Sequence, residues 1–317
     1  MTSALASAIT KAASRQTYYT IRLLVDRPLV DDAYRAYAYF RWVDDVLDAV
    51  SSSGWNGADA ERRARAGFLD RQQSLLAACL RGEEPSEVSR HEAMLVELIR
   101  HAGRSDPRLV GYLRHMMLVM AFDVRRRGRL ISQQELDEYT GSLAIAVTEA
   151  MHYFIGNGDM AHGDTEPDGE VRYLAVSGAH IAHMLRDTFV DLEAGYFNVP
   201  REMLETFLIG PGDVRCDPYR AWVEERVRLA RTYLEAGKGY FARVQSRRHQ
   251  LAGLLYIARF ESVLDAIEHG GFTLQPGYRD RRGPATAARI GRYAIASLPR
   301  PGRRQIDVLS SSRESRP

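Results

Sequence analysis

The sequence predicts an all-α protein built as one domain. Its apolar residues recur mostly at intervals of three and four, the period of a helix with one buried face, and the alternating runs typical of strands are scarce. The length of 317 residues suffices for one large domain with a sizeable core. We expect this domain to cover residues 1–298 and to be followed by a disordered, Arg- and Ser-rich tail over residues 299–317.

Helices are predicted in order along the first half of the chain. They cover residues 4–25, 33–50, 60–81, 88–103, 107–127 and 132–155. The first ends before Arg27-Pro28, and Asp31 or Asp32 can cap the second. Ser132 with Glu135 forms a capping box that starts the last of these helices.

The second half begins with a polar, glycine-bearing loop over 157–169. Helices follow over residues 170–194, 219–246, 250–269 and 285–297. Gly195 is a favourable C-terminal cap for the first of them, because glycine adopts the left-handed conformation that often ends a helix. The stretch from Pro211 to Pro218 is a second connector.

Composition excludes several classes of function. A formal net charge of +2 gives no field that would support nucleic-acid binding. No uninterrupted apolar run approaches the roughly 20 residues that span a bilayer. Cys79 and Cys216 are far apart and form neither a metal-ligand cluster nor a disulfide framework, which fits a reducing compartment. These features predict a cytoplasmic protein, and nothing in them indicates an oligomeric state.

Two acidic pairs carry the chemistry. Asp44 and Asp48 lie in RWVDDVLDA, and Asp187 and Asp191 lie in MLRDTFVDLEAG. The i, i+4 spacing places the two carboxylates of a pair on one helix face, about 5–6 Å apart at Cβ. If the two helices face each other, four carboxylates repel one another unless cations relieve the charge. Hard oxygen ligands suit Mg²⁺, which shares its coordination shell with substrate phosphates.

For one such motif taken alone, the alternative is a solvent-exposed helix whose Asp/Arg pairs lie on the surface and contribute little to stability. The surroundings argue against it here, since the first pair lies in an aromatic stretch and the second on a helix that is apolar nearly all round. Arginines precede both pairs, Arg41 the first and Arg186 the second. The pattern therefore indicates a metal-dependent enzyme that acts on a diphosphate.

The sequence also resembles a known family. The segments Tyr18-Tyr19, YAYFRWVDDVLDA and HMLRDTFVDLEAGYFNVPRE, in this order, and ARFESVLDAIEHGGFTL near the C-terminus resemble the squalene/phytoene synthase family. The resemblance implies an isoprenoid-synthase-type helical bundle around a central cavity. It also implies a prenyltransferase that joins two farnesyl or geranylgeranyl diphosphates head to head through a cyclopropyl intermediate.

The resemblance assigns roles to single residues. Asp44, Asp48, Asp187 and Asp191 would hold two or three Mg²⁺ ions that bridge to prenyl diphosphates. The expected catalytic residues around them are Arg41, Arg186, Tyr37 and His183. The expected substrate-binding residues are Ser14, Arg15, Tyr18, Tyr19, Arg125 and His180. No dinucleotide-binding fingerprint is present, so a reductive step that uses NADPH has no positive support.

Several positions depart from the family pattern. His180 and His183 stand where many members carry Gln and Asn. The usual GRIYLP-like stretch reads GYFNVP over 195–200, and the glycine-rich VAGxVG segment reads LAIAVT over 143–148. Such changes leave ionisation of a first diphosphate intact, but they bear on the later steps, where cavity shape selects the product.

The two histidines and the altered segments leave alternatives open. The histidines can be core residues, or an imidazole can join the metal shell, in which case zinc or iron becomes conceivable. The altered segments are compatible with a terpene cyclase or with prenyl transfer to another acceptor. A non-catalytic assembly or lipid-binding protein on the same fold is a further alternative.

Basic residues between Arg279 and Arg304 can pair with anionic lipids, which would permit peripheral membrane contact.

Overall fold

The computed structural model describes residues 2–49, 58–155 and 169–278. Within these ranges the chain is helical and contains no strand, as predicted. The helices are α1 (Thr2–Ala13), α2 (Arg15–Leu24), η1 (Arg27–Leu29), α3 (Val30–Ala49), α4 (Ala58–Arg81), α5 (Glu92–Ala102), α6 (Pro107–Arg126), α7 (Gln133–Phe154), α8 (Val171–Glu193), α9 (Arg201–Phe207), α10 (Asp217–Arg243) and α11 (Arg247–His269).

Two boundaries near the N-terminus differ from the prediction. The single helix expected over 4–25 is broken into α1 and α2 at Ser14, whose extended backbone and side chain cap α2 by accepting from the Thr17 amide. Helix α3 starts directly from the 3₁₀ turn η1, so Asp31 and Asp32 lie inside its first turn and do not cap it. The cap at Ser14 therefore ends one helix and starts the next, although the apolar period continues through this position.

Other boundary predictions are confirmed. Ser132 and Glu135 make both hydrogen bonds of the capping box at the start of α7. Helix α8 ends just before Gly195, which has φ of 82° and so adopts the left-handed conformation expected after a helix. Helix α9 was not predicted, because its seven residues are too few to show a helical period.

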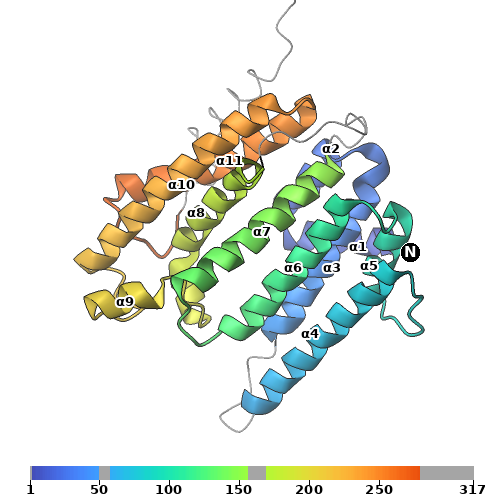
Figure 1. Cartoon of the computed structure of the whole chain (residues 1–317), viewed down its shortest axis with the longest axis horizontal. Coiled ribbons are helices and arrows are strands. Elements are labelled where there is room, and N and C mark those ends of the chain that lie inside the picture. Colours follow the sequence, from blue (N-terminus) through green and yellow to red (C-terminus); the bar gives the residue numbers. More distant parts are fainter. Residues whose placement is uncertain (1, 50–57, 156–168, 279–317) are drawn as a thin grey trace, which may run out of the picture.

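The helices form a layered bundle. Figure 1 shows α8, α7 and α6 side by side, with α10 and α11 packed on the free side of α8 and with α3 and α4 beside α6. Two core clusters result, one built mainly from α1 to α7 and the other mainly from α8 to α11.

The contact between α8 and α10 is unusually close. A Cβ on Gly178 would lie 2.8 Å from the Ala230 carbonyl oxygen, and one on Gly237 would lie 2.6 Å from Ala175 Cβ. Glycine is required at both places because the helix backbones approach so closely. This packing fixes α8, and with it the second acidic pair.

The predicted tail over 299–317, the helix over 285–297 and nearly all of the loop over 157–169 lie outside the described residues. Among the helices that the structure describes, none is both long and apolar enough to cross a membrane.

Candidate active site

The C-terminal ends of α3, α6 and α8 lie at the same end of the bundle, toward the lower left of Figure 1. Each of these ends carries carboxylates, and together they form a group that we call the carboxylate cluster: Asp44, Asp48, Asp123, Asp187 and Asp191. Helix C-termini carry a partial negative charge of their own. Three such ends with five carboxylates make this region strongly attractive to cations.

The first acidic pair belongs to α3. Arg41 donates from Nη1 to Asp44 Oδ2 at 3.2 Å and also pairs with the exposed Asp45. The pKa of Asp44 is raised to about 6, mainly by burial and also by the neighbouring Asp48, while Arg41 opposes both effects. The motif arginine therefore compensates only part of the negative charge of its own pair.

The second pair belongs to α8. The buried Arg186 forms a bidentate ion pair with Asp187, in which Nε lies 2.6 Å from Oδ1. The pKa of Asp191 is raised to about 6, mainly by burial; a hydrogen bond from Asn198 opposes this shift, and repulsion from Asp187 adds to it. Arg186 thus holds the carboxylate of Asp187 in place, and Asn198 holds that of Asp191.

Asp123 joins the two pairs and was missed by the sequence analysis. It lies near the end of α6, accepts from Arg126 Nε at 2.7 Å and accepts from the Tyr139 hydroxyl at 3.2 Å. Burial raises its pKa, and it interacts electrostatically with Asp48 and Asp191 from the other two helices. An acid within the apolar stretch LVMAFDV was the available signal, because a buried acid needs a partner.

The carboxylate cluster suits Mg²⁺ chemically. Among the described residues no three His, Cys, Asp or Glu side chains form a ready-made metal cage. Mg²⁺ commonly binds through one or two carboxylates and completes its shell with water and substrate phosphates. The raised pKa values of Asp44 and Asp191 reflect burial and repulsion between like charges, which a divalent cation would relieve. Residues in both pairs therefore fit the ion.

The two histidines of α8 occupy different environments. His180 is buried edge-on against Tyr139, with ring centroids 5.1 Å apart, and burial lowers its pKa to about 3. His183 is half-exposed, and its Nε2 lies 3.2 Å from Asp187 Oδ2. His183 is thus in contact with the second pair, whereas His180 packs beneath it as a neutral ring.

Other predicted site residues are not brought to the carboxylates by the contacts that the structure describes. Ser14 caps α2, Arg15 is exposed, and Tyr18 stacks on Tyr34 and meets Tyr19 edge-on. Their roles in substrate binding stay predictions.

Two predicted residues lie closer to the carboxylate cluster in sequence. Tyr37 is half-buried one turn before Arg41 on α3. Arg125 is exposed and lines a pocket of about 440 Å³ between α6 and α7, together with Phe122 and Tyr139. The arginine of this run that reaches the carboxylates is the next one, Arg126.

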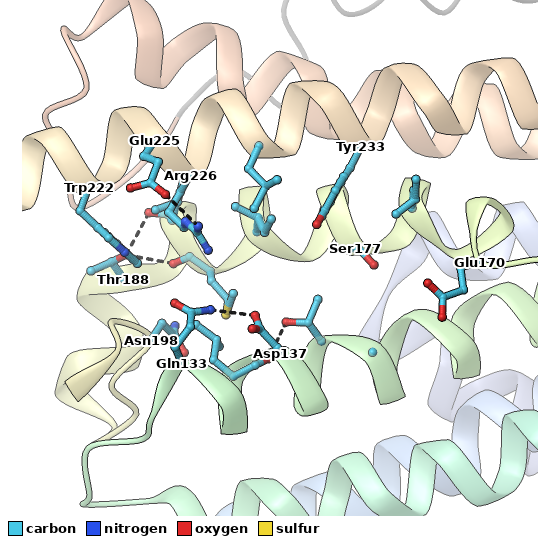
Figure 2. Close-up of a pocket in the computed structure, with 18 residues that line it drawn as sticks. Gln133, Asp137, Glu170, Ser177, Thr188, Asn198, Trp222, Glu225, Arg226 and Tyr233 are labelled. Carbon is cyan, nitrogen blue, oxygen red and sulfur yellow. Dashed lines mark hydrogen bonds and ion pairs between the residues drawn. The ribbon is translucent and has the colours of Figure 1, made fainter. Parts of the chain in front are cut away.

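A larger pocket of about 660 Å³ lies between α7, α8 and α10. Figure 2 shows it with Trp222, Arg226 and Tyr233 entering from α10 above α8. Thr188 lines this pocket and Asp187 does not; adjacent residues are about 100° apart around a helix, so the pocket opens on another face of α8. Asn198 lines the pocket and also donates to Asp191, so it connects the pocket with the carboxylate cluster.

A family model described as squalene/phytoene synthase matches residues 10–288 of the chain. The chain is similar in structure to squalene synthase HpnC from Alicyclobacillus acidocaldarius, with 20% identity, a TM-score of 0.65, and coverage of 86% of this chain and 95% of that one. It is also similar to TcSQS in complex with the ligand BPH1237, with 14% identity, a TM-score of 0.64, and coverage of 93% and 91%.

At these identities the structural likeness establishes the fold. Among curated proteins none matches the chain. The family match covers most of the sequence, including both acidic pairs.

Proposed function

The chain belongs to the squalene/phytoene synthase family, and from this premise we propose that it is a Mg²⁺-dependent enzyme that joins two farnesyl or two geranylgeranyl diphosphates head to head. The product would be a squalene-, dehydrosqualene- or phytoene-like hydrocarbon. Family membership makes the chain a prenyltransferase of the head-to-head kind. The substrates, the metal dependence and the product are the proposed part.

The carboxylate cluster is the observation that carries this proposal. Asp44 and Asp191 have pKa values raised to about 6, so at neutral pH both are ionised at the cost of burial and repulsion. A protein keeps such a cluster when a cationic ligand compensates it in the working state. Asp44, Asp48, Asp187 and Asp191 would hold Mg²⁺, which when bound neutralises charge that develops on the leaving diphosphate.

The motif arginines prepare the same site for diphosphate. Arg41 and Arg186 are now paired with Asp44 and Asp187. With Mg²⁺ bound at those carboxylates, the guanidinium groups would be available to donate to diphosphate oxygens, for which their planar donor geometry is suited. In the first step the C–O bond of one prenyl diphosphate breaks, new C–C bonds join its chain to the second substrate as a cyclopropane, and a proton is lost. The second diphosphate leaves in a later step, which ends with loss of a proton for a phytoene- or dehydrosqualene-like product and needs a hydride donor for a squalene-like one. Charge compensation at the departing oxygens lowers the barrier to the first event.

Diphosphate release from farnesyl and geranylgeranyl diphosphate, measured with and without Mg²⁺ and followed by mass analysis of the extracted product, tests the proposal. Metal-dependent release with a C30 or C40 product is expected. A C15 or C20 product would identify a cyclase, and a product that contains an added acceptor would identify another prenyl transfer. Absence of release from both substrates would favour a binding protein.

A cytoplasmic location with peripheral membrane contact is a further part of the proposal. It is supported by the apolar character of the expected product, which partitions into lipid. Cosedimentation with vesicles of anionic and of neutral lipid tests it, and equal recovery in the supernatant with both would contradict it.

A further inference from the structure

The loop after α8 carries the two residues that depart from the GRIYLP-like pattern noted above, Tyr196 at the place of its arginine and Asn198 at the place of its tyrosine. The Tyr196 amide donates to the Asp191 carbonyl oxygen at 2.7 Å, so the loop starts directly against the helix turn that carries the second acidic pair.

Arg126 of α6 reaches the same loop from the other side. Its side chain is buried, with 8% of its surface exposed. The guanidinium lies over the rings of both Tyr139 and Tyr196, at 4.7 Å and 4.8 Å from their centroids. A cation from α6 is thus stacked on the tyrosine that stands in place of the arginine.

Hydrogen bonds tie Arg126 to the same loop. Its Nη1 donates to Asn198 Oδ1 at 2.7 Å, while its Nε donates to Asp123. The Gly128 amide donates to the Gly195 carbonyl oxygen at 2.8 Å, so the turn after α6 and the turn after α8 are also joined through the backbone.

Both residues that Arg126 contacts in this loop touch a carboxylate of an acidic pair. The Tyr196 hydroxyl lies 3.5 Å from Asp48 Oδ1, the outer limit of a hydrogen bond. Asn198 donates from Nδ2 to Asp191 Oδ2 at 2.6 Å. Since Arg126 takes the oxygen of the Asn198 amide, the amide must present its NH₂ group to Asp191. One buried arginine therefore fixes a contact to each pair.

We propose that Arg126 is a positioning residue that, through Tyr196 and Asn198, sets the separation of the two acidic pairs. This role rests on the proposed function, because the separation matters when metal and diphosphate must bridge the pairs. Arg126 acts through other side chains and is not assigned a contact with substrate.

Separation is a sensitive quantity in such a site. Ions that bridge two helices to a diphosphate need ligand positions held within a few tenths of an ångström. Groups that orient metal ligands from behind typically change metal affinity by about 10–100-fold when removed. Loss of Arg126 should therefore be seen first in the binding of metal and diphosphate together.

Calorimetric titration of the full chain with inorganic diphosphate in the presence of Mg²⁺ measures this binding. We expect Arg126→Gln to weaken it by about tenfold or more, as for other groups that orient metal ligands. Arg126→Lys should fall between, because it keeps the charge but cannot donate from a planar fork. The matched control is Arg129→Gln, which removes an exposed guanidinium paired with Glu135 in the same turn region. Equal affinity of Arg126→Gln and wild type would overturn the proposal.

Two further measurements separate positioning from loss of fold. The Mg²⁺ concentration for half-maximal diphosphate binding, taken well below the melting temperature, should rise in Arg126→Gln and stay unchanged in Arg129→Gln. If Arg126→Gln does not melt cooperatively, Asn198→Ala and Tyr196→Phe each remove one contact and leave the arginine in place. Unchanged binding in both of these variants would then overturn the proposal.

The same experiment distinguishes this inference from the proposed reaction. A wild-type protein that binds Mg²⁺ with diphosphate but releases none from prenyl substrates would reject the reaction and leave the comparison with Arg126→Gln valid. Prenyl turnover in wild type and in Arg126→Gln with the same Mg²⁺ dependence would keep the reaction and reject the role of Arg126. A wild type that binds neither ligand would reject both.

Discussion

The two ends of α7 lie beside buried polar groups whose charges are balanced in different ways. Near its start, Tyr139 contacts the carboxylate cluster. Near its end lies a second group, which we call the histidine network: Glu149, His152, Arg172, Tyr173, Tyr240 and His249. In the network Glu149 pairs with Arg172 at 3.0 Å, and His152 Nε2 lies 2.8 Å from the Tyr240 hydroxyl.

Burial acts on both regions with different results at neutral pH. It lowers the pKa of His152 to about 4 and that of His249 to about 3, so both rings are neutral at pH 7. It raises the pKa of Asp44 and Asp191 only to about 6, so both stay ionised at pH 7. At pH 7 the histidine network therefore holds uncharged rings beside the Glu149–Arg172 pair, whereas the carboxylate cluster holds ionised groups that are partly buried. The network has the character of a polar core, and the cluster has the charge that the proposed binding site requires.

We expect the largest effect, a loss of diphosphate release, when one carboxylate charge is removed from the carboxylate cluster. In Asp44→Asn and in Asp187→Asn we expect diphosphate release to fall by about 10²–10³-fold, the magnitude for removing preorganised charge at a reacting centre. The melting temperature of Asp44→Asn should stay unchanged or rise, because burial and repulsion from Asp48 disfavour the charged form of Asp44. That of Asp187→Asn should fall, because the buried Arg186 loses the partner of its ion pair. Asp70→Asn, an exposed acid on α4, serves as the control. Full turnover in both cluster variants would remove the metal role.

The second-largest expected effect is a loss of folding stability at acidic pH, caused by the histidine network. Its histidines have folded pKa values below the usual 6.5, so the unfolded chain binds more protons as the pH falls from about 6.5 toward 4. Stability is therefore lost on acidification through that window. His249→Phe should reduce this loss by about 2–3 kcal/mol between pH 6.5 and 4.5, since each unit is about 1.4 kcal/mol for a group that titrates only when unfolded.

Urea unfolding of wild type and His249→Phe at both pH values measures this loss. Phenylalanine is suited to the site because the ring of His249 packs against those of His152 and Phe241. A parallel loss of stability in both proteins would show that the network does not carry the acid sensitivity, and the contrast with the carboxylate cluster would then fail.

A smaller effect is expected from Tyr240→Phe. It removes the hydroxyl that contacts His152 Nε2 within the core and should lower the free energy of unfolding by about 1–2 kcal/mol. Diphosphate release at 25 °C should remain that of wild type, because the change lies at the opposite end of α7 from the carboxylates. Reduced release together with unchanged stability would mean that the two regions are not separate.

Local patterns in the sequence determined much of the fold and both acidic pairs. The spacing of Asp44 and Asp48 places both on one face of any helix that contains them, and the same holds for Asp187 and Asp191. Ser132 and Gly195 marked helix ends because capping depends on residues within one turn. The break at Ser14 is also local, but it competed with an apolar period that continued through it.

Only the tertiary structure decided which residues join the two pairs. Arg125 and Arg126 are equivalent in the sequence, yet adjacent residues lie about 100° apart around a helix, and of these two Arg126 is the one that contacts the loop after α8. Asp123, Tyr196 and Asn198 likewise gain their roles from contacts between segments remote in the chain. Periodicity fixes the face of a helix on which a side chain lies, but its partner is set by how the helices pack.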